Sequence, residues 1–106
     1  MIKAMVLIPR TFNDGSPVDA AIFEEFIVRV HFLSPEGHTV RPDSRGQWRD
    51  ASGTVFVDVL DEYTFALPGW RDVASFVSLV DWARVAFAQE AMYIEIMGAP
   101  EVLGPP

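Results

Sequence analysis

Apolar and polar residues alternate along the chain with periods that change from segment to segment. Residues 2–8, IKAMVLI, are mostly apolar and end at Pro9, which predicts a strand buried on both faces. From Pro17 onward apolar side chains recur every three or four positions, which predicts an amphipathic helix with Ser16 as its N-cap. The SPEG stretch at 34–37 ends that helix.

The rest of the chain predicts three more strands and a second helix. Residues 38–49 alternate with a period of two, which indicates a strand with one charged face. Residues 54–67 are rich in β-branched and aromatic side chains, and the short DASG stretch before them predicts a hairpin. Helical spacing over about 71–89 predicts the second helix, and AMYIEIM at 91–97 predicts the last strand.

The order strand, helix, strand, strand, helix, strand predicts an α+β fold of the ferredoxin-like kind. In that fold a four-stranded antiparallel sheet carries both helices on one face. Right-handed crossovers place the first and third strands in the centre and the second and fourth at the edges. We therefore expect one domain over residues 1–98, followed by a proline-rich tail without regular structure over 99–106.

Charge pairing predicts how the two hairpin strands lie against each other. If the chain turns at the middle of its DASG stretch, Arg45 lies opposite Asp58 and Arg41 lies opposite Glu62. Opposite charges directly across a strand pair each contribute roughly 0.2–1 kcal/mol, so this register is consistent with the charges. It is the register that we expect.

The same register assigns each side chain of the hairpin to a face of the sheet. Trp48 is predicted to face the helices as part of the core, whereas Arg45 and Gln47 are predicted to point to the open face, away from the helices. A bulge at Pro42 or at Gly46 would shift the pairing by one residue.

The open face of the predicted sheet has an apolar centre with a charged rim. Alternation brings Met5, Leu7 and Met97 to it. An apolar patch of this kind on a water-soluble domain marks an interface or a ligand groove. The predicted ligand-binding or interface residues are Arg41, Arg45, Gln47, Phe56, Asp58, Leu60, Glu62, Tyr93 and Glu95.

Three uses of this face remain open at the level of the sequence. Edge-strand arginines can simply prevent sheets from joining edge to edge. Our leading hypothesis is a homodimer packed through the open faces, acting as a small-molecule-binding or protein-interaction module. Aromatic rings beside carboxylates suit an organic cation, or an aromatic ligand. Alternatively, a carboxylate in the groove serves as general base in a cofactor-independent enzyme of the isomerase or monooxygenase type.

The composition of the chain restricts the classes of partner and cofactor that we expect. The chain has 106 residues, no cysteine and a formal net charge of −7. Negative charge repels nucleic-acid phosphates, and the absence of cysteine excludes disulfides and metal–thiolate sites. The two histidines indicate surface positions and no metal site. No stretch approaches the roughly 20 apolar residues that cross a bilayer, so we expect a cytoplasmic protein with no cofactor, nucleic-acid partner or membrane partner.

Two short motifs resemble those of an uncharacterised bacterial family of small domain-of-unknown-function proteins. They are Gly-Gln-Trp-Arg at 46–49 and Phe-x-Gln-Glu at 87–90. The resemblance covers roughly residues 35–96. It implies a ferredoxin-like domain and no established activity. We do not expect the secretion signal that many members carry, so their location is not transferred to this chain.

Overall fold

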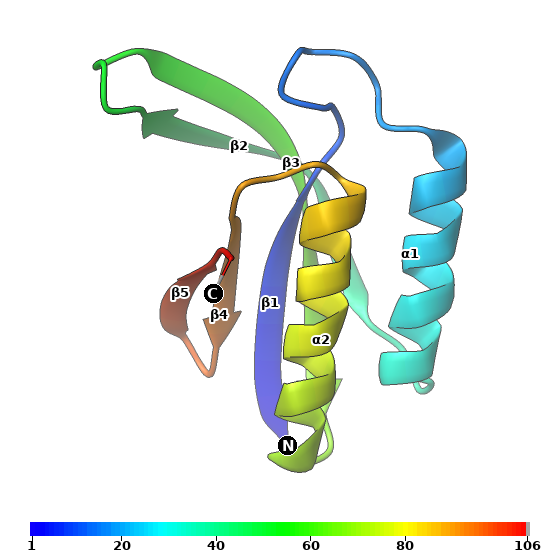
Figure 1. The fold of residues 1–106 in the computed structure, drawn as a ribbon. Coiled ribbons are helices and arrows are strands. Elements are labelled where there is room, and N and C mark those ends of the chain that lie inside the picture. The colour runs from blue at the N-terminus through cyan, green and yellow to red at the C-terminus, as the bar shows by residue number, and fades with distance from the viewer. Residues whose placement is uncertain (106) are drawn as a thin grey trace.

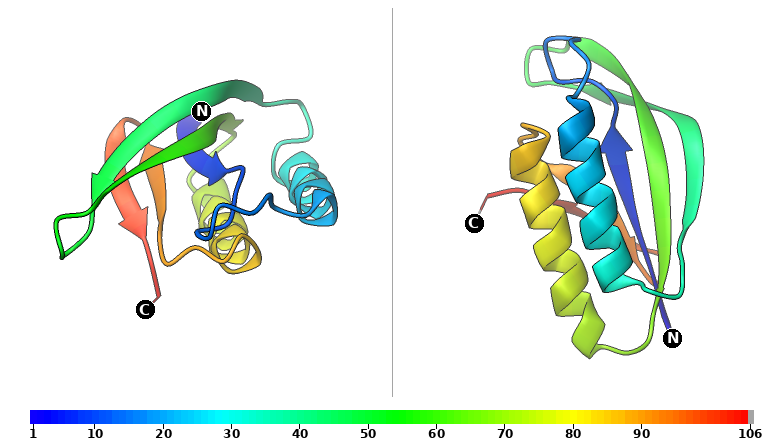
Figure 2. Two further views of the ribbon diagram at one scale, coloured as in Figure 1. Left: turned by 90° about the horizontal axis from the view of Figure 1, so that it is seen from above. Right: turned by 90° about the vertical axis from the view of Figure 1, so that its right-hand side faces the viewer.

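The computed structural model describes residues 1–105 as an antiparallel sheet with two helices on one of its faces (Figures 1 and 2). The ferredoxin-like α+β fold predicted from the sequence is confirmed. The sheet order is β2-β3-β1-β4-β5, so the first and third strands are central, as expected. In chain order the elements are β1 (Ile2–Pro9), α1 (Ala20–Leu33), β2 (Thr39–Arg49), β3 (Val55–Leu67), α2 (Arg71–Ala86), β4 (Met92–Ile96) and β5 (Ala99–Leu103).

The sheet has a fifth strand at a place where the sequence predicted an irregular tail. Residues 99–103 form β5 and pair antiparallel with β4. β4 is therefore an inner strand and β5 is the edge. The two turn residues, Met97 and Gly98, have φ angles of 52° and 80°, and this left-handed pair is the geometry that reverses a two-residue hairpin. Pro106, the end of the predicted tail, lies outside the described residues.

The helices differ from their predicted bounds at one end each. α1 begins at Ala20 instead of Pro17, because Pro17 forms a β-bridge with Thr11 and the Ser16 hydroxyl bonds to the Asp14 carboxylate. α2 ends at Ala86, before the predicted residue 89, where Ala88 turns to a φ of 53°. Neither helix within residues 1–105 is long and apolar enough to cross a membrane.

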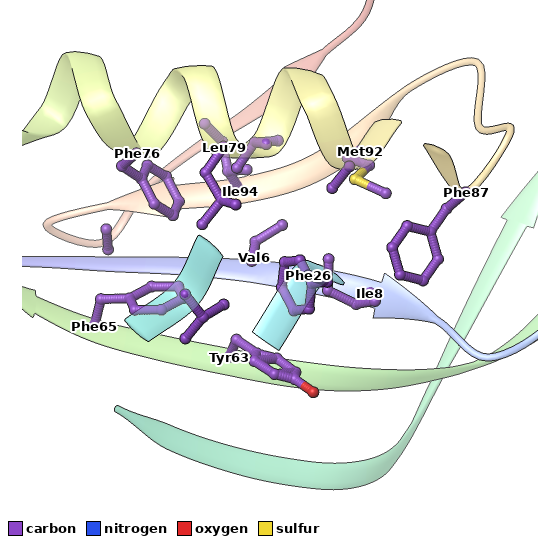
Figure 3. Close-up of a cluster of buried hydrophobic side chains, with 14 of the residues drawn as sticks. Val6, Ile8, Phe26, Tyr63, Phe65, Phe76, Leu79, Phe87, Met92 and Ile94 are labelled. Carbon is purple, nitrogen blue, oxygen red and sulfur yellow. The ribbon is translucent and has the colours of Figure 1, made fainter. Parts of the chain in front are cut away.

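Phenylalanines form the centre of the core between the helices and the sheet (Figure 3). Phe26 of α1, Phe65 of β3, Phe76 of α2 and Phe87 just after α2 are all almost completely buried. The rings of Phe65 and Phe76 meet edge to face with their centroids 5.8 Å apart, a favourable aromatic geometry. This packing covers one face of the sheet and leaves the other open.

Candidate functional site

A bulge in β2 decides which of its side chains reach the open face. Arg41 lies opposite Glu62, but the next paired residue, Ser44, lies opposite Leu60, so two positions of β2 match one of β3. Within the bulge, Asp43 has a left-handed φ of 61°, a conformation that Asp adopts more readily than most residues. Beyond this point the alternation of β2 is displaced by one residue.

Contacts from β1 and β3 hold the bulge in place. The Arg10 guanidinium, just after β1, contacts the Asp61 carboxylate at 3.0 Å and the Asp43 carboxylate at 2.8 Å. The backbone N–H of Asp43 donates to the same Asp61 oxygen at 3.3 Å. Asp61 is buried, and its hydrogen bond and negative charge raise the pKa of Arg10. The bulge is therefore tied to the rigid centre of the sheet.

The displaced register moves Trp48 to the open face, and its predicted place in the core was wrong. Trp48 lies opposite Phe56, and the two rings stack with their centroids 4.5 Å apart. The indole N–H donates to the Asp58 carboxylate at 2.8 Å. This aromatic pair stands at the outer end of the hairpin, and both rings are more than one-third exposed.

The predicted open-face positions of Arg45 and Gln47 were also wrong, for the same reason. Arg45 lies opposite Val59 rather than Asp58, so it points to the other side of the hairpin. The side chains on that side form a surface that we call the valine face. Its residues are Arg45, Gln47, Arg49, Val55, Val57 and Val59.

The other predicted candidates lie on the open face, although their roles in binding stay a prediction. The pairing of Arg41 with Glu62 is confirmed, with the guanidinium 3.9 Å from the carboxylate. The candidates on this face are Arg41, Phe56, Asp58, Leu60, Glu62, Tyr93 and Glu95.

A small hollow lies on the open face where β3, β1 and β4 run side by side. It has a volume of about 70 Å³ and is lined by Lys3, Ala4, Met5, Glu62, Glu95 and Gly98. The Tyr93 ring stands beside it, two residues before Glu95 on the same strand face. Burial, and then the neighbouring Glu95 carboxylate, raise the pKa of Tyr93, so its phenol stays protonated at neutral pH.

Lys3, Gly98 and Trp48 belong to this face but were not among the predicted site residues. Lys3 alternates with Met5, so the period of two along the first strand was sufficient to find it. Gly98 could not be placed without the turn into β5, and Trp48 could not be placed without the bulge.

A groove between the helices and a pair of histidines are weaker candidates for a binding site. An open groove of about 620 Å³ runs between α1 and α2, but its charged residues, Glu25 and Arg29, already pair with each other at 3.0 Å. The rings of His31 and His38 lie 5.6 Å apart, and the half-buried His38 stacks on Tyr63. Among residues 1–105, no three side chains of His, Asp or Glu gather closely enough to hold a metal ion.

Comparison with known proteins identifies solved structures that share this fold. The chain is similar to a phage SAM lyase in complex with S-methyl-5'-thioadenosine, with a TM-score of 0.74 and 15% sequence identity over 98% of this chain and 89% of that one. It is similarly close to a phage SAM lyase in the apo state, with a TM-score of 0.70 and 12% identity over the same shares. At this identity the likeness establishes the fold. No protein-family model and no curated protein matches the chain.

Proposed function

We propose that the protein binds a small organic cation of the S-adenosylmethionine class on the open face of its sheet. The observation that carries this proposal is the hollow on the open face, which is lined by two carboxylate residues, Glu62 and Glu95, against one lysine, Lys3. The sulfonium of S-adenosylmethionine is a positive charge within an apolar surrounding. Carboxylates and aromatic faces both attract such a cation. A fold shared with a SAM lyase supports the choice of ligand class.

The hollow is too small to hold such a ligand by itself. Binding sites for ligands of this size have volumes of about 300–1,000 Å³, whereas this hollow has about 70 Å³. It can surround a methylated sulfur but not an adenine ring as well. We therefore propose that a second copy of the chain supplies the remaining wall of the site.

A cofactor-independent enzyme is the second candidate function. Conversion of S-adenosylmethionine to S-methyl-5'-thioadenosine breaks one carbon–sulfur bond, and the bonding electrons stay on the sulfur, which becomes neutral. If the four-carbon fragment leaves by elimination, it must lose a proton to a base. Glu95 stands where it could accept that proton, and the protonated Tyr93 phenol beside it can donate a hydrogen bond to a carboxylate of the substrate.

Calorimetric titration with S-adenosylmethionine and with neutral S-methyl-5'-thioadenosine tests the binding proposal. We expect both compounds to bind the wild type. Glu95→Gln keeps the shape but removes the negative charge, so it should weaken binding of the cation by about tenfold. It should change binding of the neutral thioether by less than about twofold.

Glu24→Gln is the matched control, because it makes the same change on the exposed side of α1. It should bind both compounds like the wild type. No heat from either compound at millimolar concentration, or an equal loss for both with Glu95→Gln, would contradict a cation site. Chromatography can detect S-methyl-5'-thioadenosine released from S-adenosylmethionine. Its release would indicate an enzyme, whereas binding without release would indicate a binding module.

A further inference from the structure

The outer part of the β2–β3 hairpin projects from the rest of the molecule as an arm, which we define as residues 45–59 (Figure 1; Figure 2, left). The pairing of β1 with β3 ends at Pro9 and Leu60, so residues 55–59 of β3 pair with β2 alone. A two-stranded hairpin with both faces in water is only marginally stable. The arm therefore has two faces that its own chain leaves uncovered.

The valine face of the arm combines apolar surface with positive charge. Val55 and Val57 are about half exposed, at 50% and 55%. Arg45 and Arg49 flank them and make no ion pair with any other residue in the described part of the chain. The nearest acids are engaged elsewhere: Asp58 points to the open face, and the Asp50 carboxylate accepts backbone N–H groups of the turn.

The opposite edge of the sheet combines apolar surface with negative charge. On the open side of β4 and β5 lie Tyr93, Glu95, Pro100 and Val102, which together we call the ribbon face. Val102 is 61% exposed. Residues 91–103 contain neither lysine nor arginine. Of their two glutamates, Glu95 lies on this face, whereas Glu101, opposite the buried Ile94, lies on the other. In one chain both the valine face and the ribbon face stay exposed, so they do not cover each other.

We propose that the valine face of one copy docks on the ribbon face of a second copy. The valine face offers Val55, Val57 and Val59, and the ribbon face offers Tyr93, Pro100 and Val102, so the contact buries apolar area. The charges of the two faces are opposite in sign, which attracts one face toward the other. The contact joins two different surfaces, so it is not the symmetric packing of open face on open face expected from the sequence. It also brings a second chain to the rim of the small hollow.

This inference goes beyond ligand binding, and its test needs no ligand. Light scattering after size-exclusion chromatography measures the mass of the full chain at micromolar concentration. We expect the wild type to be larger than a single chain. Val57→Asp on the valine face and Val102→Asp on the ribbon face should each give the mass of one chain. Val85→Asp is the matched control on the outer side of α2, where the valine is 66% exposed, and should keep the wild-type mass.

Mixing the two interface variants tests whether the contact joins different surfaces. Val57→Asp retains an intact ribbon face and Val102→Asp retains an intact valine face, so an equimolar mixture should form a species of two chains. A wild type with the mass of a single chain, an unchanged mass for either variant, or a mixture that stays monomeric would each overturn the proposal. Circular dichroism checks that each variant folds. If Val57→Asp does not fold, the double variant Arg45→Glu with Arg49→Glu replaces it, with the same expected loss of mass.

Discussion

Trp48 shows how the position of one side chain depends on a contact distant in the sequence. Its neighbours alternate in polarity as a strand should, and nothing within residues 45–50 indicates that the order of faces has changed. The displacement comes from the bulge, which Arg10 and Asp61 hold although they are 51 residues apart. Trp48 therefore lies on the open face, at the outer end of the hairpin, instead of in the core.

Asp43 has the left-handed backbone conformation within the bulge that displaces the register of β2. Substituting it should show how much this conformation costs in stability. Val and Gly both remove the ion pair with Arg10, but only Val places a β-branched side chain at a left-handed φ. We expect Asp43→Val to have a free energy of unfolding about 1–2 kcal/mol lower than that of Asp43→Gly. Urea denaturation measures the difference. Equal stabilities would mean that the bulge moves or disappears in the variants.

His38 makes the stability of the fold depend on pH. Burial, and then the charge of the nearby His31, lower the pKa of His38, and the buried Nδ1 has no hydrogen-bond partner in the described structure. The unfolded chain, where a histidine has a pKa of about 6.5, thus binds this proton more tightly than the folded chain. The free energy of unfolding is therefore undiminished by His38 above a pH of about 6.5, and it decreases as the pH falls toward the lower pKa that His38 has in the folded chain.

Melting temperatures at about pH 7.5 and about pH 5.5 test this linkage. We expect the wild type to melt lower at the acidic pH, and His38→Phe, which preserves an aromatic ring against Tyr63, to lose most of that difference. His31→Gln is the control and should keep most of it, because burial is the larger cause of the shift. An equal decrease in the wild type and in His38→Phe would assign the pH dependence to other groups.

Among the elements, the strands and helices followed from the sequence better than the turns between them. Apolar periodicity identified both helices and the first four strands, because each buries one face or stripe against the same core. The sequence also offered Pro42 as one of two places for a bulge, and the bulge lies there. It could not choose between Pro42 and Gly46, because the choice rests on Arg10 and Asp61.

The turn between β4 and β5 should depend on the glycine at position 98. Gly98 has a φ of 80°, and a β-carbon added to it would meet no atom within 4 Å, so any cost of substitution comes from the backbone alone. We expect Gly98→Ala to lower the free energy of unfolding by about 1 kcal/mol. Gly69→Ala is the matched control, since Gly69 also has open space but no left-handed φ, and should change stability by less than about 0.5 kcal/mol.

For the whole molecule, the valine face and the ribbon face of one chain carry charges of opposite sign. If the valine face docks on the ribbon face, part of the attraction is electrostatic. Raising the salt from about 0.1 M to about 1 M shortens the Debye length from about 10 Å to about 3 Å. We expect the dissociation constant of the assembly to rise over this range, as measured by sedimentation.

A charge-neutral variant separates this effect from the apolar contact. Arg45→Gln with Arg49→Gln removes the positive charges and leaves the valines. It should associate more weakly than the wild type at low salt and show little further change as salt is added. An assembly of the wild type that is insensitive to salt would assign the contact to the valines alone.

The amino-acid sequence by itself determined the ferredoxin-like fold, its two central strands and the apolar stripes by which both helices contact the core. These features follow from local periodicity, because each element must turn its apolar side chains toward one common interior. Only the tertiary structure decided which side chains of the hairpin lie on the open face, and that residues 99–103 form a strand. Alternation along a strand shows that neighbouring side chains lie on opposite faces of the sheet, but it does not show which face each one occupies. In β2 the Arg10–Asp61 contact, which holds the bulge, decides the face.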